Sequence, residues 1–177
     1  MTLPLAAAAP GASLQAPSLR RRLASLVYEV LVCFGVALVP GAIGALLLGI
    51  TGEPQEAASR VIAFFIFGAY FTWFWTRRGQ TLPMQTWHMR LVAVDGGPVS
   101  FPRAAARYVA ACAWVAPAMA LSWANGWTRW QALAAVGVGV VAYAALARLH
   151  PQGQFLHDAL CGTRLIDAKP APRPSTR

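Results

Sequence analysis

A single carboxylate lies inside the first long apolar stretch of the chain. Glu29 is embedded in a run of mostly apolar residues that extends from Leu23 to Ile50. If this run is a helix rising about 1.5 Å per residue, the carboxyl group lies roughly 10 Å from its start. A charge at that depth in a membrane is costly and usually belongs to a functional site. The position therefore predicts either a proton or cation site at Glu29 or a buried ion pair.

Two arginines and an aspartate are expected to form ion pairs with this carboxylate or near it. Arg22 precedes Glu29 by seven residues and shares its helix face, but two helical turns separate them. We therefore expect Arg107, from another apolar stretch, to pair with Glu29, and Asp158 to meet Arg22 at the membrane surface. These pairs would either only fix helix packing, or leave Glu29 in a cavity where it exchanges a proton or binds a cation.

The histidines and cysteines follow no recognisable metal or catalytic pattern. His150 and His157 are seven residues apart, which is not the spacing of a metal pair on one helix face. Cys33, Cys112 and Cys161 are widely separated, so neither a disulfide framework nor a zinc site is expected. No nucleophile and base stand at a recognisable spacing. We expect no metal, no cofactor and no enzymatic activity, and we expect His157 to form hydrogen bonds near the interface.

The composition indicates a lipid environment for the elements that must position these residues. Hydrophobic residues make up 57% of the chain and charged residues 12%, against roughly 45–50% and about 25% in soluble domains. A helix that crosses the bilayer needs about 20 apolar residues, and four stretches approach this length. They cover residues of about 23–50, 57–75, 104–123 and 130–149. Pro40-Gly41 predicts a kink in the first stretch, and the third carries Pro117 and is the least hydrophobic.

The basic residues are distributed unevenly around these stretches. Thirteen of the fifteen lie in the two terminal regions and in or beside the loop 77–103, whereas only Arg60 and Arg129 lie near the other two loops. Cations are retained on the cytoplasmic side of short loops, so both termini are predicted to be cytoplasmic. The net charge of +9 then reflects topology, with membrane lipids rather than nucleic acid as partners.

The loop 77–103 is too long and too patterned to be a mere linker. Residues 87–94 and 99–101 flank the turn sequence Asp95-Gly96-Gly97-Pro98 and predict a small β-hairpin. Further along the chain, residues 154–160 predict a short helix, and residues 163–166 predict a strand that adds to the hairpin as a third.

The predicted fold is an all-α membrane protein of four transmembrane helices with both termini inside. It carries a small cytoplasmic β-hairpin or three-stranded element. Residues 20–167 form the domain, and residues 1–19 and 168–177 are expected to be disordered tails.

Three motifs follow one another along the chain. The first is Arg21-Arg22-Leu23-Ala24-Ser25. The second is Gly79-Gln80-Thr81, followed by Arg90-Leu91-Val92 and Asp95-Gly96-Gly97. The third is His157-Asp158-Ala159-Leu160-Cys161-Gly162-Thr163. They resemble the opening motif, the central signature and the closing signature of the RDD family of bacterial integral membrane proteins. Together the motifs cover the chain from about residue 20 to residue 167.

The resemblance assigns roles to individual residues. The arginine and the two aspartates of the family's name correspond to Arg22, position 29 and Asp158. Position 29 is Glu here, which keeps the carboxylate but adds a methylene group. The family often continues its central motif with Gly-Lys, whereas this chain has Pro83-Met84 and therefore lacks that cation.

The resemblance also implies a location and two alternative functions. The location is the bacterial inner membrane. Transport, including exchange of cations and protons, has been proposed for the family, and Glu29 would then carry the ion. The alternative is a structural or accessory membrane protein whose Arg/acid pairs only fix helix packing.

Two further features keep two interpretations each. Gly79, Gln80 and Thr81 would either end the second helix or present backbone amides to a phosphate or headgroup. Small residues in the stretch 130–149 would permit close helix approach within the monomer or in a homo-oligomer. Gly162 is expected to cap the short helix 154–160, with Thr163 starting the strand.

Overall fold

The computed structural model describes residues 16–53, 56–147 and 153–168. Its elements in chain order are α1 (Leu19–Thr51), α2 (Glu56–Arg77), α3 (Leu82–Thr86), β1 (Met89–Ala93), α4 (Phe101–Ala113), α5 (Ala116–Ala124), α6 (Arg129–Leu146), α7 (Leu156–Leu160) and β2 (Thr163–Asp167). The prediction of a mainly helical chain with a small β element is confirmed. The predicted tails fall almost entirely on residues 1–15 and 169–177, outside the described residues.

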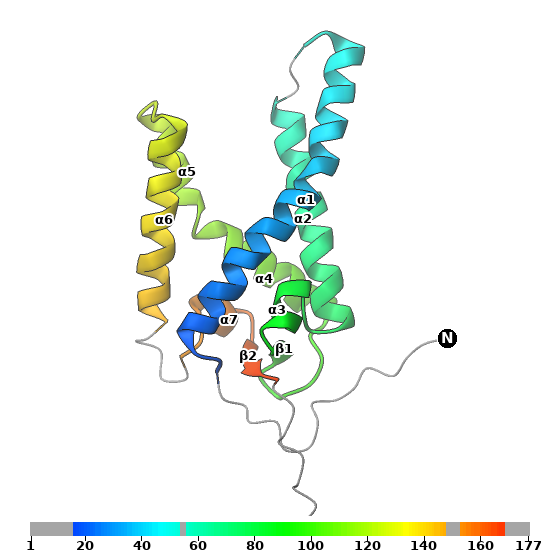
Figure 1. Cartoon of the computed structure of the whole chain (residues 1–177). Coiled ribbons are helices and arrows are strands. Elements are labelled where there is room, and N and C mark those ends of the chain that lie inside the picture. Colours follow the sequence, from blue (N-terminus) through cyan, green and yellow to red (C-terminus); the bar gives the residue numbers. More distant parts are fainter. Residues whose placement is uncertain (1–15, 54–55, 148–152, 169–177) are drawn as a thin grey trace, which may run out of the picture.

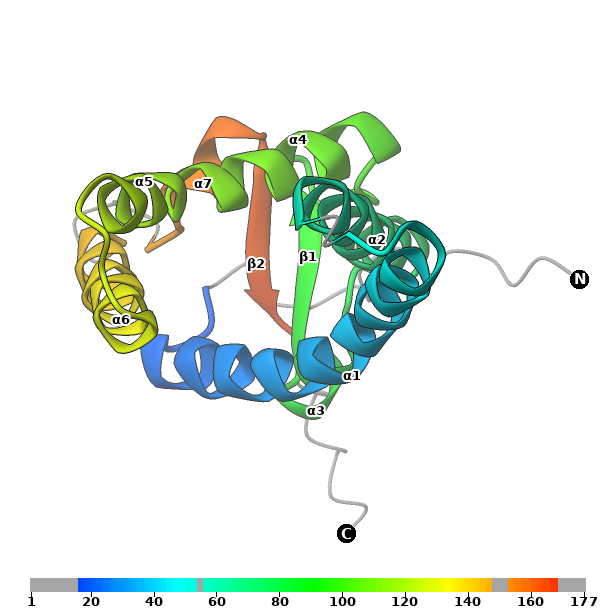
Figure 2. The same ribbon diagram turned by 90° about the horizontal axis from the view of Figure 1, so that it is seen from above.

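The long helices form two pairs that diverge from a common base (Figure 1). α1 packs against α2, and α5 packs against α6. We call these pairs the α1–α2 arm and the α5–α6 arm, and we call α3, α7, β1 and β2 the base layer. α4 crosses between the arms, and the sheet is surrounded by α1, α2, α4, α5 and α6 when the molecule is seen from above (Figure 2). Within the described residues, no helix of one arm makes extensive contact with a helix of the other.

Among the described residues, four segments are long and apolar enough to cross a membrane, as the sequence predicts. They are Leu19–Thr51, Ala57–Thr86, Phe101–Ala124 and Arg129–Leu146. Large apolar side chains are exposed along them, including Phe34 at 73%, Ile50 at 72% and Val138 at 70%. A soluble protein does not expose apolar surface on this scale. These helices therefore have the surfaces of membrane-embedded segments.

The third of these segments is broken into two helices, although the sequence predicts one continuous stretch. α4 ends at Ala113 and α5 begins at Ala116, with Pro117 in the first turn of α5. Proline is tolerated there because the first amides of a helix have no intrahelical acceptor. α5 has 9 residues, so at about 1.5 Å per residue it is too short to cross a bilayer without α4.

The first segment bends, as its proline predicts. Pro40 lies inside α1, where it removes one backbone donor and crowds the preceding turn. The helix changes direction between its blue and its cyan parts (Figure 1). The lower part of α1 therefore leans over the base layer, while its upper part runs beside α2.

The base layer contains one antiparallel strand pair instead of a hairpin. β1 pairs with β2, with Leu91 opposite Leu165, so the strand predicted at 163–166 is confirmed. The predicted strand at 99–101 is wrong, because Ser100 is the residue just before α4 and Pro102 lies in the first turn of that helix. Proline has no amide to give to a sheet and fits the start of a helix. The chain therefore leaves the predicted turn and enters α4 directly.

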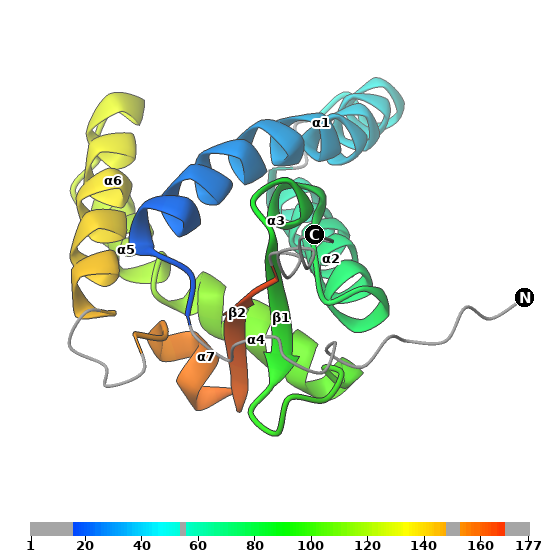
Figure 3. The ribbon, with the colours of Figure 1, turned by 60° about the horizontal axis from the view of Figure 1, so that its bottom comes forward.

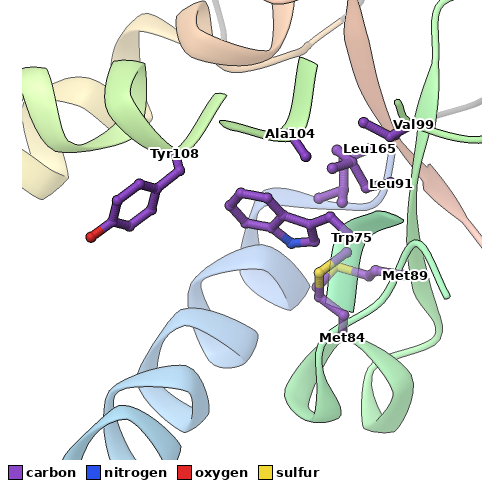
Figure 4. Packing of buried hydrophobic residues seen from close by; sticks show 8 residues of the cluster. All are labelled: Trp75, Met84, Met89, Leu91, Val99, Ala104, Tyr108 and Leu165. Atoms are coloured by element: carbon purple, nitrogen blue, oxygen red, sulfur yellow. The ribbon is translucent and has the colours of Figure 1, made fainter. Parts of the chain in front are cut away.

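A small core joins the sheet to α2 and α4. Figure 3 shows α4 crossing the two strands, and Figure 4 shows Trp75 of α2 between α4 and the strands. The buried members of this core are Trp75, Met84, Met89, Leu91, Val99, Ala104, Tyr108 and Leu165. Ala104 has no exposed surface, and its small side chain lets α4 lie close to Trp75. This core fixes the position of the charged residues described next.

Candidate functional site

Glu29 is held by two neutral hydroxyl groups. The Tyr70 hydroxyl donates to Glu29 Oε1 over 3.0 Å, and the Thr81 hydroxyl donates to Glu29 Oε2 over 2.5 Å. The second distance is typical of a hydroxyl bonded to an ionised carboxylate. Tyr70 comes from α2 and Thr81 from the residue before α3, so the carboxylate joins three segments. Half-buried on α1, it accepts from both hydroxyls, and within the described residues no cation contacts it directly.

Arg107 binds the other carboxylate, so the predicted pairing of Glu29 with Arg107 is wrong. Arg107 Nε donates to Asp158 Oδ1 over 2.7 Å. The Thr163 hydroxyl donates to the same oxygen over 3.3 Å, and the guanidinium lies 4.2 Å from the centre of the Trp75 ring. Asp158 has no exposed surface. Removing one partner of such a buried pair leaves an uncompensated charge, so this contact is a clamp between α4 and α7.

Arg22 is bound by carbonyl groups instead of by Asp158, which corrects the second predicted pairing. Its Nε donates to the Pro17 carbonyl over 3.0 Å, and its Nη1 donates to the Gly153 carbonyl over 2.6 Å. The guanidinium also lies 5.2 Å from the centre of the Phe155 ring. Arg22 thus ties the start of α1 to the segment before α7.

The four predicted charged residues nevertheless lie in one electrostatic group. Glu29 interacts with the charge of Arg107 at longer range, and Arg22 interacts in the same way with the charge of Asp158. Arg107 and Asp158, the two residues that connect these interactions, are in direct contact. The sequence therefore identifies the right residues but assigns the direct contact to the wrong pairs.

Gly79 and Gln80 attach the end of α2 to the free edge of β1. The Gly79 carbonyl accepts from the Leu91 amide over 2.7 Å, and Gln80 Nε2 donates to the Met89 carbonyl over 2.7 Å. Gly79 has a φ of +66°, and a Cβ atom there would lie 2.7 Å from the Leu91 carbonyl oxygen. Only glycine fits this position without strain. Of the two predicted roles for these residues, the structure supports the ending of the second helix, because the Gly79 amide bonds back to the Trp75 carbonyl.

Thr81 serves two elements at once. Its side chain accepts from the Met84 amide as the N-cap of α3, and it donates to Glu29. It has no exposed surface. Thr81, the last residue of the Gly79-Gln80-Thr81 segment, therefore contacts the carboxylate of α1. The sequence analysis did not predict this contact.

His157 packs against Tyr143 of α6. Its Nδ1 lies 2.8 Å from the Tyr143 hydroxyl, and its Nε2 lies 3.7 Å from Asp158 Oδ1. Burial, and then the positive charge of Arg107, lower the pKa of His157 to about 4, although Asp158 acts in the opposite direction. His157 is therefore neutral at pH 7. It hydrogen-bonds at the base, as expected, and Gly162, with a φ of +61°, follows α7 and leads into β2.

Two further residues belong to the site and were missed. Arg21 bonds to Asp167 over 2.5 Å and to the carbonyls of Trp87 and His88, and so ties α1 to both strands of the sheet. Tyr70 was overlooked among the aromatic residues of α2, although its hydroxyl was a signal that it needs a polar partner in lipid. Within the part of the chain that the structure describes, no group of three His, Cys, Asp or Glu side chains could bind a metal.

The fold and the site together define a helical integral membrane protein with a charged and hydrogen-bonded base. Four apolar helical segments with exposed hydrophobic surfaces make the class plain. The chain belongs to the RDD family, whose model matches residues 16–162. The resemblance drawn from the three motifs is thereby confirmed. No match to the chain was found among the curated proteins or among the solved structures.

Proposed function

We propose that this RDD-family protein takes up and releases a proton or a small cation at Glu29 as part of transport across the bacterial inner membrane. The observation that carries the proposal is the set of contacts around Glu29. Both of its carboxylate oxygens accept from neutral hydroxyls, while Arg107, the cation predicted to pair with it, is bound to Asp158.

The neutral contacts favour exchange chemistry over a permanent ion pair. A carboxylate paired with arginine cannot be neutralised without leaving a guanidinium unpaired, which is costly in a membrane. A carboxylate held by hydroxyls has no such restraint, because a hydroxyl group can both donate and accept. Glu29 is also only half-buried by other protein atoms, so packed side chains do not enclose it completely.

The test compares Glu29→Gln with the wild-type protein in proteoliposomes under imposed pH and sodium gradients. Glu53→Gln is the matched control, because it makes the same chemical change at an exposed residue just after α1. We expect Glu29→Gln to abolish ion flux and Glu53→Gln to retain it. Wild-type flux in Glu29→Gln would contradict the proposal.

The buried contact between Arg107 and Asp158 favours a second function, that of a structural or accessory membrane protein. In that case Glu29 would belong to the same packing network and would carry no ion. Glu29→Gln would then lower the yield of folded protein on size-exclusion chromatography, and no variant would change flux. Measuring yield and flux on the same preparations separates the two functions.

We also propose that both termini are cytoplasmic. The described chain begins and ends at the base (Figure 1). Thirteen of the fifteen cations of the full sequence lie in the terminal regions and in or beside the loop 77–103. Positive charge is retained on the cytoplasmic side. Reporter fusions at residues 16 and 168 should both indicate the cytoplasm, and a fusion in the loop after α1 should indicate the opposite side. A terminal fusion reporting the periplasm would overturn this topology.

A further inference from the structure

We infer that Thr81 is a positioning residue that couples the charge on Glu29 to the docking of α3 and the sheet. The inference rests on the proposed function, in which Glu29 gains and loses charge. Thr81 is the junction because one hydroxyl group makes both contacts. It donates to Glu29 Oε2 at 2.5 Å and accepts from the Met84 amide at 3.4 Å.

Protonation of Glu29 must change the hydrogen-bond pattern at this site, because the number of donors and acceptors changes. An ionised carboxylate has two acceptor oxygens, and the hydroxyls of Tyr70 and Thr81 satisfy one each. A protonated carboxyl group has one carbonyl oxygen and one donor, so one hydroxyl must become an acceptor or both must share the carbonyl. In either case the charge-assisted bond from Thr81 is lost or weakened.

The change passes from Thr81 to the base layer through its neighbours in the chain. Gly79 and Gln80 immediately precede Thr81 and hold the edge of β1 through bonds to Leu91 and Met89. Met84, which follows it, is part of the buried core. A shift of the Thr81 hydroxyl therefore acts on the cap of α3 and on the edge of the sheet together.

Other groups face Glu29, and they make different contacts. Tyr70 of α2 bonds to Oε1, Arg107 of α4 acts only at longer range, and Cys33 on α1 interacts electrostatically with the carboxylate. None of these three caps α3. Tyr70→Phe is therefore the matched control, because it removes a hydroxyl from the same carboxylate and leaves the cap in place.

The experiment measures amide hydrogen exchange of residues 82–93 in the full-length protein in nanodiscs at one pH. Glu29→Gln mimics the neutral carboxyl group. It is made alone and in two double variants, one with Thr81→Val, which lacks the hydroxyl, and one with Thr81→Ser, which keeps it. We expect Glu29→Gln to speed exchange in this segment about tenfold with Thr or Ser at position 81. With Val at position 81, Glu29→Gln should have no further effect, and Tyr70→Phe should leave exchange unchanged.

Additive effects of Glu29→Gln and Thr81→Val would overturn the inference, since independent sites add and coupled sites do not. A large effect of Tyr70→Phe would overturn it as well. If Glu29→Gln does not fold, exchange is compared at two pH values in a His157→Gln background, which removes the pH dependence expected from His157. Wild-type Thr81, Thr81→Val and Thr81→Ser are compared there, corrected for intrinsic rates, and only Thr81→Val should lose the remaining pH dependence. Flux is measured separately. Coupling without Glu29-dependent flux would refute the proposed function alone, and flux without coupling would refute this inference alone.

Discussion

Arg107 interacts with two carboxylates and forms its ion pair with the more deeply buried one. It interacts electrostatically with Glu29 and contacts Asp158. The fully buried carboxylate has no water to solvate it, so the direct contact stabilises the charge that needs it most. Glu29, which is half-buried and held by hydroxyls, is left available for chemistry.

The contact between Arg107 and Asp158 should be essential for folding. Asp158→Ala leaves the guanidinium without its partner and is expected to cost about 3–5 kcal/mol. Thermal unfolding in detergent should show the loss. Replacing both residues by apolar ones, Arg107→Met with Asp158→Leu, should recover much of it. A double variant as unstable as Asp158→Ala would contradict this view of the pair.

His157 should make stability depend on pH in the acid range. Its pKa is lowered to about 4 in the folded protein, below the value of about 6.5 in an unfolded chain. The unfolded state therefore binds more protons between these values, and stability falls as pH falls from 6.5 to 4. The loss should reach about 2 kcal/mol at pH 5. His157→Gln should flatten the change in melting temperature between pH 7 and pH 5, and an unchanged slope would contradict this assignment.

At the scale of elements, the central motif works as a connector between a helix and a strand. Gly79 ends α2 and binds β1, Gln80 extends the same edge, and Thr81 starts α3. On the other edge, Gln154 bonds to both backbone groups of Leu165. Side chains and loop backbone therefore satisfy both edges of a sheet of only two strands, which would be marginal alone.

Gly79→Ala should disrupt this connector. The new Cβ would lie 2.7 Å from the Leu91 carbonyl oxygen, at a φ of +66°, and such a change costs about 1–3 kcal/mol. The control is Gly137→Ala in α6, where no atom lies within 4 Å of the added Cβ and alanine favours the helix. Gly79→Ala should melt at a lower temperature and Gly137→Ala should not. Equal melting temperatures would contradict the proposed close approach.

The sequence predicts elements here better than it predicts contacts. Hydrophobic stretches of bilayer length reveal the four candidate spans, because a membrane imposes length and polarity directly on the chain. The charged contacts depend on the rotation of each helix, which hydropathy does not encode, and so Arg107 was assigned to the wrong carboxylate. The prediction of a strand at 99–101 was wrong because short apolar runs do not distinguish a strand from the start of a helix. Pro102 favours the helix start at this position.

At the scale of the whole molecule, the two arms are each packed internally and are joined through α4 and the base layer. In the α1–α2 arm, Gly44 allows close contact, since a Cβ there would lie 2.9 Å from Ser59 Oγ and 3.8 Å from Ser59 Cβ. The second distance equals the mean Cβ separation of a disulfide. Gly139 of the α5–α6 arm makes a similar close approach to Trp114, the residue that follows α4.

Gly44→Cys with Ser59→Cys should therefore form a disulfide in a background where Cys33, Cys112 and Cys161 are replaced by alanine. The bond should form under mild oxidation in membranes and be visible as a mobility shift on non-reducing gels. Ser59→Cys with Gly137→Cys places the thiols on different arms and should remain reduced. Failure of the first pair, or bonding of the second to the same extent, would contradict the arrangement of the arms.

The pairing of β1 with β2 also determines the order in which the parts of the protein can assemble during synthesis. The ribosome makes β1 between the second and third candidate spans and makes β2, along with Asp158, after the fourth. Until then the β1 strand has no partner strand, and the Arg107 side chain has no Asp158 to bind. Insertion of the spans into the bilayer can therefore precede assembly of the base layer. A nascent protein arrested before its last few dozen residues could have its spans inserted but would lack both the pairing of β1 with β2 and the contact between Arg107 and Asp158.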